Sequence, residues 1–305
     1  LTLIFKKGDD LMEDDHNHGN SSNIKVAFLL NFGFTILEII GGIWTNSLAI
    51  LSDAVHDLGD TFSLGLAWFL DGYSDKKPDL NYSFGYSRFS LLGALVNSLV
   101  LLIGSILIII RAIPRIINPE HSNAQGMLIF AIMGIIMNGL AVLKMRDGKS
   151  LNEKVVMWHL LEDVMGWVAI LVVSIILMFK EIRVLDPILS IGITIYVLYN
   201  VVRNMIEVFK VFLQSVPEGI SISDLEAKIV EIDGVDSVHH THVWSLEGEH
   251  NYLSTHAVIP ECTVKGRQVE IKEKIKKLLN MNDIDHVTVE IEFADEVNLE
   301  EESDI

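Results

Sequence analysis

Two segments far apart in the sequence repeat the pattern His-x-x-x-Asp. His56 and Asp60 form the first pair, and His159 and Asp163 form the second. On a helix, residues four positions apart lie one above the other on the same face. Two such helices packed face to face would present two imidazole nitrogens and two carboxylate oxygens. This set fits tetrahedral zinc, whereas calcium and magnesium prefer about six or more oxygens.

Three further acidic residues share these helix faces. Asp53 and Asp57 fall with the first pair within an arc of about 100°, and Glu162 adjoins Asp163. Because four ligands already fill a tetrahedral shell, we expect Asp53, Asp57 and Glu162 to support the ligands or to carry protons. For any single such residue another interpretation stays open, namely a hydrogen bond between helices or contact with a water-filled cavity.

Both pairs lie in long apolar segments. The chain is 50% hydrophobic with a mean hydropathy of +0.39. Soluble domains reach a similar apolar fraction, so the total does not distinguish a soluble from a membrane protein. The distribution of apolar residues along the chain does. Residues 89–110 carry no charge and are long enough to cross ~30 Å of hydrocarbon. We predict a polytopic α-helical membrane protein with six transmembrane helices, at about 24–44, 48–70, 89–110, 124–143, 155–179 and 186–203. An intramembrane carboxylate costs at least ~2.5 kcal/mol, so those in 48–70 and 155–179 indicate a function.

Basic residues beside the predicted spans set the orientation. Ten flank one side: Lys25, Lys76, Lys77, Arg88, Lys144, Arg146, Lys149, Lys154, Arg203 and Lys210. Four flank the other: Arg111, Arg115, Lys180 and Arg183. We therefore expect both termini in the cytoplasm. The net charge of −18 is compatible with this orientation, because acidic residues contribute little to the rule. The single cysteine, Cys262, excludes an intrachain disulfide.

The remainder of the chain has the pattern of a small soluble domain. We expect a helix capped by Ser223 and ending near Ile232, a hairpin of strands 235–246 and 250–259, a second amphipathic helix, and a strand at 286–293. The last strand should point these side chains inward: Val287, Val289, Ile291 and Phe293. This αββαβ order predicts an α+β ferredoxin-like domain. It has no phosphate-binding glycine loop and no basic face, so we expect no nucleic-acid binding.

These observations divide the chain into four parts. We predict a cytoplasmic N-terminal tail (1–23), the transmembrane domain (24–213), the cytoplasmic ferredoxin-like domain (214–293) and an acidic tail (294–305). The two tails hold much of the negative charge, and we expect them to be solvated ends.

Four motifs resemble those of the cation diffusion facilitator family, in particular its zinc-transporter and zinc/cadmium/cobalt-resistance branches. They are "NSLAILSDAVHDLGD", "HLLEDVMG", "LQSVPEGI" and "HHTHVWSL", and the resemblance runs from about residue 24 to 293. It implies a homodimer, formed through the transmembrane and C-terminal domains, that exports divalent metal from the cytoplasm in exchange for protons. It also implies a multi-pass protein of the bacterial inner membrane that is not an enzyme. The implied transport site consists of His56, Asp60, His159 and Asp163.

The resemblance also implies a regulatory metal site in the soluble domain, with ligands His239, His256 and Glu292. This domain holds six of the chain's eleven histidines. Solvated strand residues are the alternative interpretation. Glu290 shares the face of Glu292, and His16 or His18 of the partner subunit would be able to complete such a site.

One further metal site of some family members is predicted to be absent here. Tyr82 and Tyr86 replace the histidines of the cytoplasmic loop, which leaves Asp79 without the other ligands. The long His-rich loop between the fourth and fifth spans is also missing. Only "HNH" at 16–18 remains as a metal-capturing tail.

The favoured function is a zinc/proton antiporter, with Co²⁺ and Cd²⁺ as further candidate substrates, that works by alternating access around the His₂Asp₂ site. Zinc would be its substrate and also a bound regulatory ion. A zinc-independent cation/proton antiporter using Asp53, Asp57 and Asp60 is one alternative. An intramembrane zinc hydrolase with Glu162 as base is another, although the chain lacks His-Glu-x-x-His. A pure metal sensor would leave the two intramembrane pairs unexplained.

Overall fold

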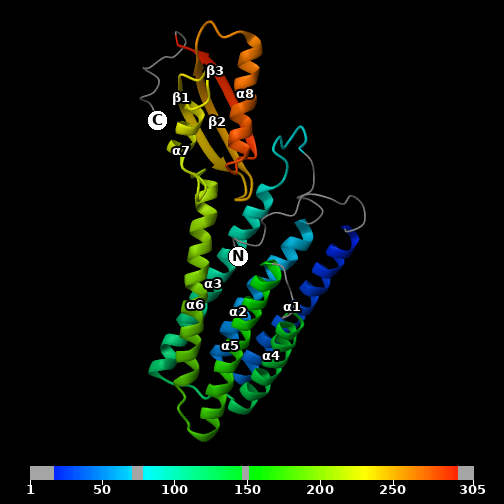
Figure 1. Ribbon diagram of the computed structural model, residues 1–305. Coiled ribbons are helices and arrows are strands. Elements are labelled where there is room, and N and C mark those ends of the chain that lie inside the picture. The colour runs from blue at the N-terminus through cyan, green and yellow to red at the C-terminus, as the bar shows by residue number, and fades with distance from the viewer. Residues whose placement is uncertain (1–16, 71–77, 146–150, 295–305) are drawn as a thin grey trace. The chain divides into compact units, whose positions relative to one another are not determined.

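The computed structural model describes residues 17–70, 78–145 and 151–294 (Figure 1). The chain divides into two compact units, with the boundary in the sequence between Ile206 and Glu207, and each unit is described by itself. The first unit is built from long helices: α1 (Asn17–Thr45), α2 (Leu48–Leu70), α3 (Arg88–Ile117), α4 (Ala124–Met145), α5 (Leu151–Phe179) and α6 (Leu185–Phe212), the last of which ends in the second unit.

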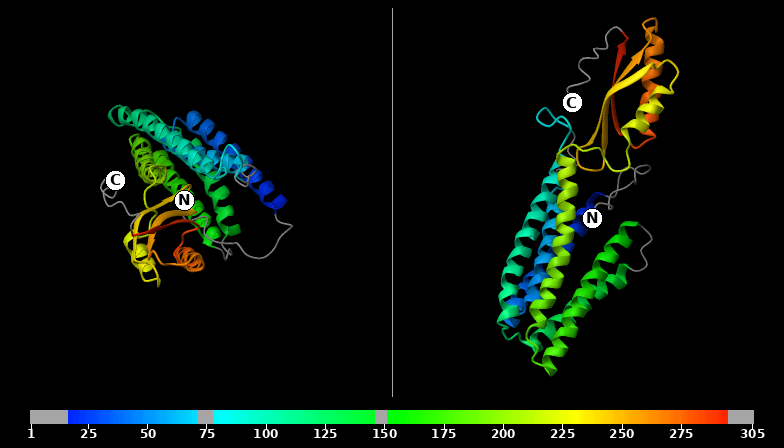
Figure 2. Two further views of the ribbon diagram at one scale, coloured as in Figure 1. Left: turned by 90° about the horizontal axis from the view of Figure 1, so that it is seen from above. Right: turned by 90° about the vertical axis from the view of Figure 1, so that its left-hand side faces the viewer.

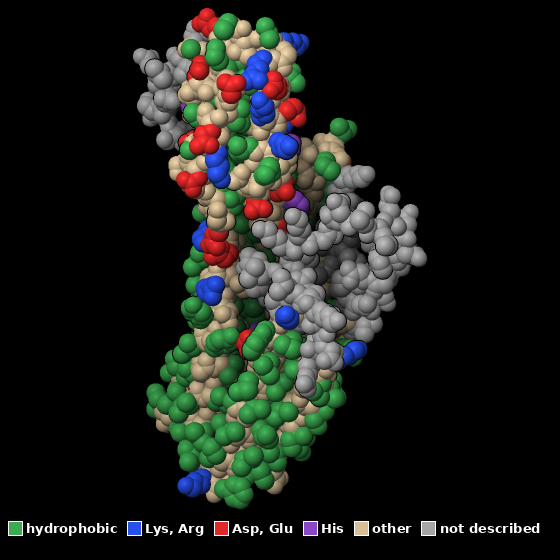
Figure 3. All heavy atoms as spheres, viewed as in Figure 1, with side chains coloured by type: hydrophobic (Ala, Val, Ile, Leu, Met, Phe, Trp, Pro, Cys, Tyr) green, Lys and Arg blue, Asp and Glu red, His purple; other side chains and the backbone are tan. Residues whose placement is uncertain are grey.

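Five of these helices are long and apolar enough to cross a membrane. Their candidate spans are Ala27–Thr45, Arg88–Ile117, Ala124–Lys144, Met157–Phe179 and Leu185–Phe212. Hydrophobic side chains dominate the face of these helices that Figure 3 shows. Helix α2 has the predicted bounds and 23 residues, but its three carboxylates set it apart from the five. Five of the six predicted spans are thus matched by apolar helices.

Several helices extend beyond the predicted spans. Helix α3 continues to Ile117, with Pro114 in its last turns, and α6 continues past Arg203 to Phe212. A basic residue marks the point where the apolar segment ends, but it does not break helical hydrogen bonding. The predictions therefore placed the ends of these apolar segments and missed the ends of the helices.

The start of α2 is fixed by Asp186 of α6. The Ser47 hydroxyl donates to its carboxylate at 2.5 Å, and the backbone N–H groups of Leu48 and Ala49 donate at 2.9 and 3.3 Å. These N–H groups have no partner within the helix, and a carboxylate there also interacts favourably with the positive end of the helix dipole. One turn on, Ser52 shares a hydrogen bond of 2.7 Å with Thr194. Helix α6 thus holds the segment that leads to His56.

A buried aromatic side chain anchors α5. Trp167 is fully buried and packs against Phe34 of α1, with ring centroids 6.1 Å apart. A Cβ on Gly134 of α4 would overlap the Trp167 ring, so glycine is what allows α4 to lie against α5 here. The same core contains Ile50 of α2. It therefore joins the helices that carry the two His-x-x-x-Asp pairs.

The second unit is a sheet covered by two helices. Its elements are α7 (Ile222–Val230), β1 (Ser237–Ser245), β2 (Asn251–Ile259), α8 (Lys265–Asn280) and β3 (His286–Phe293). The strand order is β1-β2-β3, with β1–β2 antiparallel and β2–β3 parallel. Both helices lie on one side of the sheet (Figure 2). The predicted element order is found, and the four predicted inward side chains of β3 pack against the core.

The prediction for the start of α7 was wrong. Ser221 is the N-cap, and its hydroxyl accepts from the Asp224 N–H at 3.3 Å. Ser221 has the extended backbone that a cap requires, whereas Ser223 already lies inside the helix. The helix ends at Val230, before the predicted Ile232.

Candidate functional site

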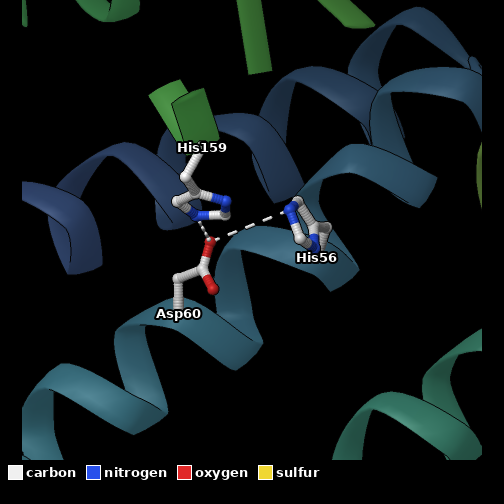
Figure 4. A group of neighbouring side chains, drawn as sticks. All are labelled: His56, Asp60 and His159. Atoms are coloured by element: carbon white, nitrogen blue, oxygen red, sulfur yellow. Dashed lines mark hydrogen bonds and ion pairs between the residues drawn. The ribbon is translucent and has the colours of Figure 1, made fainter. Parts of the chain in front are cut away.

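Three of the four predicted intramembrane ligands converge on one point. Oδ2 of Asp60 lies 2.9 Å from Nε2 of His159 and 3.8 Å from Nε2 of His56 (Figure 4). The ligand atoms of these three residues all lie within 4.8 Å of one another. The fourth, Asp163, places Oδ1 3.6 Å from Nε2 of His56. The structure therefore brings all four side chains into one chain of contacts.

Two helices position these groups. Helix α2 carries His56 and Asp60 one turn apart, and α5 carries His159 and Asp163 at the same spacing. The two imidazole rings meet edge to face, with centroids 5.6 Å apart. Asp60 thus lies between an imidazole of its own helix and one of α5, as Figure 4 shows.

The charge of the donor set can neutralise a divalent cation. Its two carboxylates carry two negative charges, and each imidazole has a ring nitrogen directed at a carboxylate. A histidine binds metal only as the neutral imidazole, so a metal and a proton compete for the same nitrogen. This site can therefore hold either a divalent cation or protons on its imidazoles.

The three additional acidic residues predicted near this site divide into two groups. Asp53 and Asp57 are buried, only 5% and 6% exposed. A Cβ on Gly166 of α5 would lie 3.5 Å from Oδ1 of Asp53, so this carboxylate lies against α5. Glu162 is exposed and interacts with Tyr196 of α6. Glu162 is therefore separated from Asp53 and Asp57.

Glu38 of α1 is a further buried carboxylate, and no motif in the sequence predicted a role for it. It is fully buried, and its acidic neighbours include Asp57 and Asp53. The available signal was a lone carboxylate within residues 26–44, which carry no other charge.

A second His/carboxylate cluster lies on the sheet. Glu292 of β3 places Oε1 2.5 Å from Nδ1 of His256 and Oε2 3.0 Å from Nε2 of His239. The ligand atoms of these three residues also lie within 4.8 Å of one another. His239 and His256 are directly paired across β1 and β2. Glu290 approaches the other side of His256, with Oε2 3.6 Å from Nε2.

His240 also joins this cluster, and the sequence analysis did not identify it. The register of β1 shifts between His239 and His242, and His240 has a left-handed φ of 48°. Such an irregularity interrupts the alternation of side chains along a strand. The His240 ring centroid consequently lies 5.1 Å from that of His239 and 5.2 Å from that of His256.

The remaining histidines of this unit have other surroundings. His250 pairs with Glu247, and this hydrogen bond raises the pKa of the His250 imidazole. His242 is exposed, and the His286 ring lies 5.6 Å from that of Tyr252. Among the described residues, the cluster therefore gathers half of the histidines of this domain.

The carboxylate of Asp79, in the loop before α3, accepts hydrogen bonds from nearby residues of the same loop. It accepts from the N–H groups of Asn81 and Tyr82 at 2.7 and 2.8 Å, and from the Tyr86 hydroxyl at 2.8 Å. The Tyr86 hydroxyl therefore donates a hydrogen bond to the Asp79 carboxylate. The absence of a metal site here stays a prediction. His16 and the side chain of His18 lie outside the described residues.

Comparison with known proteins places this chain in a family. The model of the family described as "Cation efflux transmembrane domain" matches residues 24–213. The model described as "Cation efflux protein, cytoplasmic domain" matches residues 217–294. Together the two matches cover nearly all of the described chain.

Named relatives match over almost their full length. The cadmium, cobalt and zinc/H(+)-K(+) antiporter of Bacillus subtilis is 36% identical over 287 residues, which are 91% of each chain. The metal cation efflux system protein CzcD of Cupriavidus metallidurans is 31% identical and is covered to 89%, with 92% of this chain. The zinc transporter ZitB of Yersinia pseudotuberculosis is 33% identical and is covered to 88%, with 90% of this chain. The chain therefore belongs to the zinc/cadmium/cobalt branch of the cation diffusion facilitator family, whose members are membrane transporters and not enzymes.

Proposed function

We propose that this protein exports Zn²⁺ from the cytoplasm in exchange for protons, by alternating access around the His₂Asp₂ site. The observation that carries the proposal is the convergence of His56, Asp60 and His159, with Asp163 against His56. The names of the relatives, which include zinc, cadmium, cobalt and protons, support the same chemistry. Co²⁺ and Cd²⁺ are further candidate substrates. Membership of a transporter family removes the hydrolase alternative.

The ligands themselves explain the coupling to protons. On the cytoplasmic side, neutral His56 and His159 bind the cation, and the charges of Asp60 and Asp163 offset its loss of hydration. On the other side, protons bind the imidazoles, and the protonated rings no longer ligate the metal. A change in the packing of α2 against α5 would expose the site to one side at a time.

The proposal includes the arrangement in the membrane. Helix α2, the second of the six predicted spans, also crosses the membrane, and its carboxylates are tolerated because they face α1 and α5. Both termini then lie in the cytoplasm of a bacterial cell, with the protein in the inner membrane. The domain boundaries are those predicted from the sequence: 1–23, 24–213, 214–293 and 294–305.

The second unit is proposed to be a ferredoxin-like regulatory and dimerisation domain. His239, His256 and Glu292 would hold zinc that signals its cytoplasmic concentration. The match to the cytoplasmic domain of cation efflux proteins supports this role and a homodimer. The close approach of Glu292 to both imidazoles supports the ligand set.

Removal of one imidazole tests the transport site. In proteoliposomes, His159→Ala should abolish zinc-driven proton counterflow, because the site loses one of two nitrogens and the partner of Asp60. His242→Ala is the matched control, since it removes an exposed histidine outside both clusters. An unchanged thermal unfolding midpoint would show that both variants are folded. Normal zinc transport by folded His159→Ala would overturn the proposal.

A further inference from the structure

A row of polar side chains follows one face of α6 through its first turns. Its members are spaced four residues apart, so they lie nearly one above another: Asp186, Ser190 and Thr194. All three are buried, although α6 is apolar enough to cross a membrane. A buried polar group is costly unless it is hydrogen-bonded. These three residues, which we call the α6 polar row, therefore require partners on a neighbouring helix.

The first member of the row, Asp186, completes the N-terminus of α2. Its carboxylate accepts from the Ser47 hydroxyl and from two backbone N–H groups of the first turn. The Ser47 Oγ in turn accepts from the Ile50 N–H at 3.3 Å. Asp186 also lies in the first turn of its own helix, so the positive ends of two helix dipoles interact favourably with its charge. The charge of Asp186, and not only its shape, therefore holds the two helix starts together.

The other two members of the row bond to α2 further along. The Ser190 hydroxyl donates to the backbone carbonyl of Leu48 at 3.0 Å. The Thr194 hydroxyl shares a hydrogen bond of 2.7 Å with the hydroxyl of Ser52. Hydrogen bonds require narrow ranges of distance and angle. Three sets of them at successive turns of α6 therefore restrict both the sliding of α2 along α6 and the rotation of α2 about its own axis.

The rotation of α2 decides where its zinc ligands point. Ser52, His56 and Asp60 are spaced by four residues, so they lie within an arc of about 80° on one side of the helix. At one edge of this arc Ser52 is bonded to α6, and at the other edge Asp60 lies 2.9 Å from Nε2 of His159 of α5. A rotation of α2 would therefore move both of its ligands relative to α5.

We infer that the α6 polar row sets the rotation and position of α2 for zinc binding, which makes Asp186, Ser190 and Thr194 positioning residues of the transport site. They act through the start of α2, one to two turns before His56. Removal of groups that orient metal ligands typically lowers metal affinity about 10- to 100-fold. The inference rests on the proposed function, because it takes His56 and Asp60 as ligands of the transported zinc.

Isothermal zinc titration of the full chain in detergent tests the effect of the charge. All variants carry Glu292→Ala, so that the cytoplasmic cluster does not contribute. Asp186→Asn keeps the size of the side chain and removes its charge, and it should weaken zinc binding at the transport site about tenfold. Titration well below the unfolding midpoint of each variant separates positioning from stability, since a fold that is only less stable would bind zinc with unchanged affinity.

Ser174→Ala is the matched control for this titration. It removes a buried hydroxyl that donates to the Leu171 carbonyl of the same helix, α5. The change therefore costs a buried hydrogen bond and leaves the contacts between α2 and α6 in place. Its zinc affinity should equal that of the Glu292→Ala background.

The hydroxyl pair of Ser52 and Thr194 supplies a finer test. Thr194→Val and Ser52→Ala should each weaken zinc binding about two- to tenfold, as expected for the loss of one neutral hydrogen bond. The double variant should bind no more weakly than the weaker single variant, because both changes remove the same bond. Losses that add in full would show that this bond does not position the ligands.

Two results with Asp186→Asn would overturn the inference. One is an unchanged zinc affinity in the folded variant. The other is a changed number of protons released per bound zinc, measured in two buffers of different ionisation enthalpy, because Asp186 would then exchange protons itself. If Asp186→Asn does not fold, Thr194→Val replaces it and has to weaken zinc binding.

His159→Ala separates this inference from the proposed function. In the Glu292→Ala background it removes a ligand and should abolish zinc binding at the transport site. Zinc binding that survives in folded His159→Ala would overturn the proposed function. Loss of binding in His159→Ala together with unchanged affinity in Asp186→Asn would overturn the inference alone.

Discussion

The two His/carboxylate clusters offer similar ligand atoms, but helices carry the first cluster and β-strands carry the second. In the membrane unit, separate helices supply the ligands, and α2 contacts α5 through side chains. In the second unit, hydrogen-bonded strands supply them, and His239 pairs directly with His256. The central carboxylate of the membrane cluster, Asp60, lies 2.9 and 3.8 Å from its two imidazoles, whereas Glu292 lies 2.5 and 3.0 Å from the two imidazoles of the other cluster.

This difference matches the two proposed tasks. Helices that touch through side chains can tilt or slide at little cost, and a transport site has to open to each side in turn. Backbone hydrogen bonds keep a strand pair in one register, which suits a site that binds and reports metal. We therefore expect damage to the first cluster to stop transport, and damage to the second to change only its regulation.

The largest effect is expected for Asp60→Asn. Asp60 is the one carboxylate that lies between both imidazoles, so its charge contributes most to holding zinc. Zinc flux in proteoliposomes should fall at least about 100-fold, which corresponds to ~2.7 kcal/mol. The zinc content of the cytoplasmic cluster should stay the same. A variant that transports at more than a tenth of the wild-type rate would contradict the assignment.

Glu292→Ala should produce the opposite pattern. Glu292 contacts both histidines of the cytoplasmic cluster, so its removal should abolish high-affinity zinc binding there. Flux at saturating zinc should remain within about twofold of wild type. Zinc titration of the full chain in the His159→Ala background isolates this cluster. Retained binding in the double variant would rule out Glu292 as a ligand.

A smaller effect is expected at His240. Its ring packs against those of His239 and His256, so His240→Ala should weaken zinc binding at this cluster about tenfold by loosening the ligands. His242→Ala changes an exposed residue of the same strand and should leave the affinity unchanged. Equal affinities in the two variants would show that the register shift at His240 has no part in the site.

The smallest effect concerns pH. Glu247 raises the pKa of His250, so their pairing stabilises the fold below the ordinary His pKa of ~6.5 and is lost as pH rises through the raised value. The His250 side chain is 60% exposed, so solvent screening should keep the contribution below ~1 kcal/mol. Urea unfolding of wild type and Glu247→Gln from pH 6 to 9 measures it. The two curves should converge at high pH. A gap that widens with pH would contradict this sign.

Local patterns predicted which side chains of the membrane unit come together. The spacing of His56 with Asp60, and of His159 with Asp163, already places each pair on one helix face. The αββαβ order and the inward face of β3 also follow from short-range alternation. The cytoplasmic ligands came from the family resemblance, since strand pairing across the sheet is not encoded locally.

The missed residues depend on contacts between distant segments. Glu38 gains its acidic neighbours only when α1 packs against α2, and no pattern within α1 reveals them. His240 enters the cluster only through the register shift in β1, which alternation cannot predict. Ser221 and Ser223 are both acceptable caps by residue type, and only the backbone conformation distinguishes them.

The central claim is that His56, Asp60, His159 and Asp163 hold the transported zinc. Zinc-edge X-ray absorption of the zinc-loaded Glu292→Ala variant tests it most directly, because the cytoplasmic cluster no longer contributes to the signal. We predict four-coordinate zinc with two imidazole nitrogens and two carboxylate oxygens. A spectrum without imidazole scattering, or with six oxygen ligands, would contradict the account.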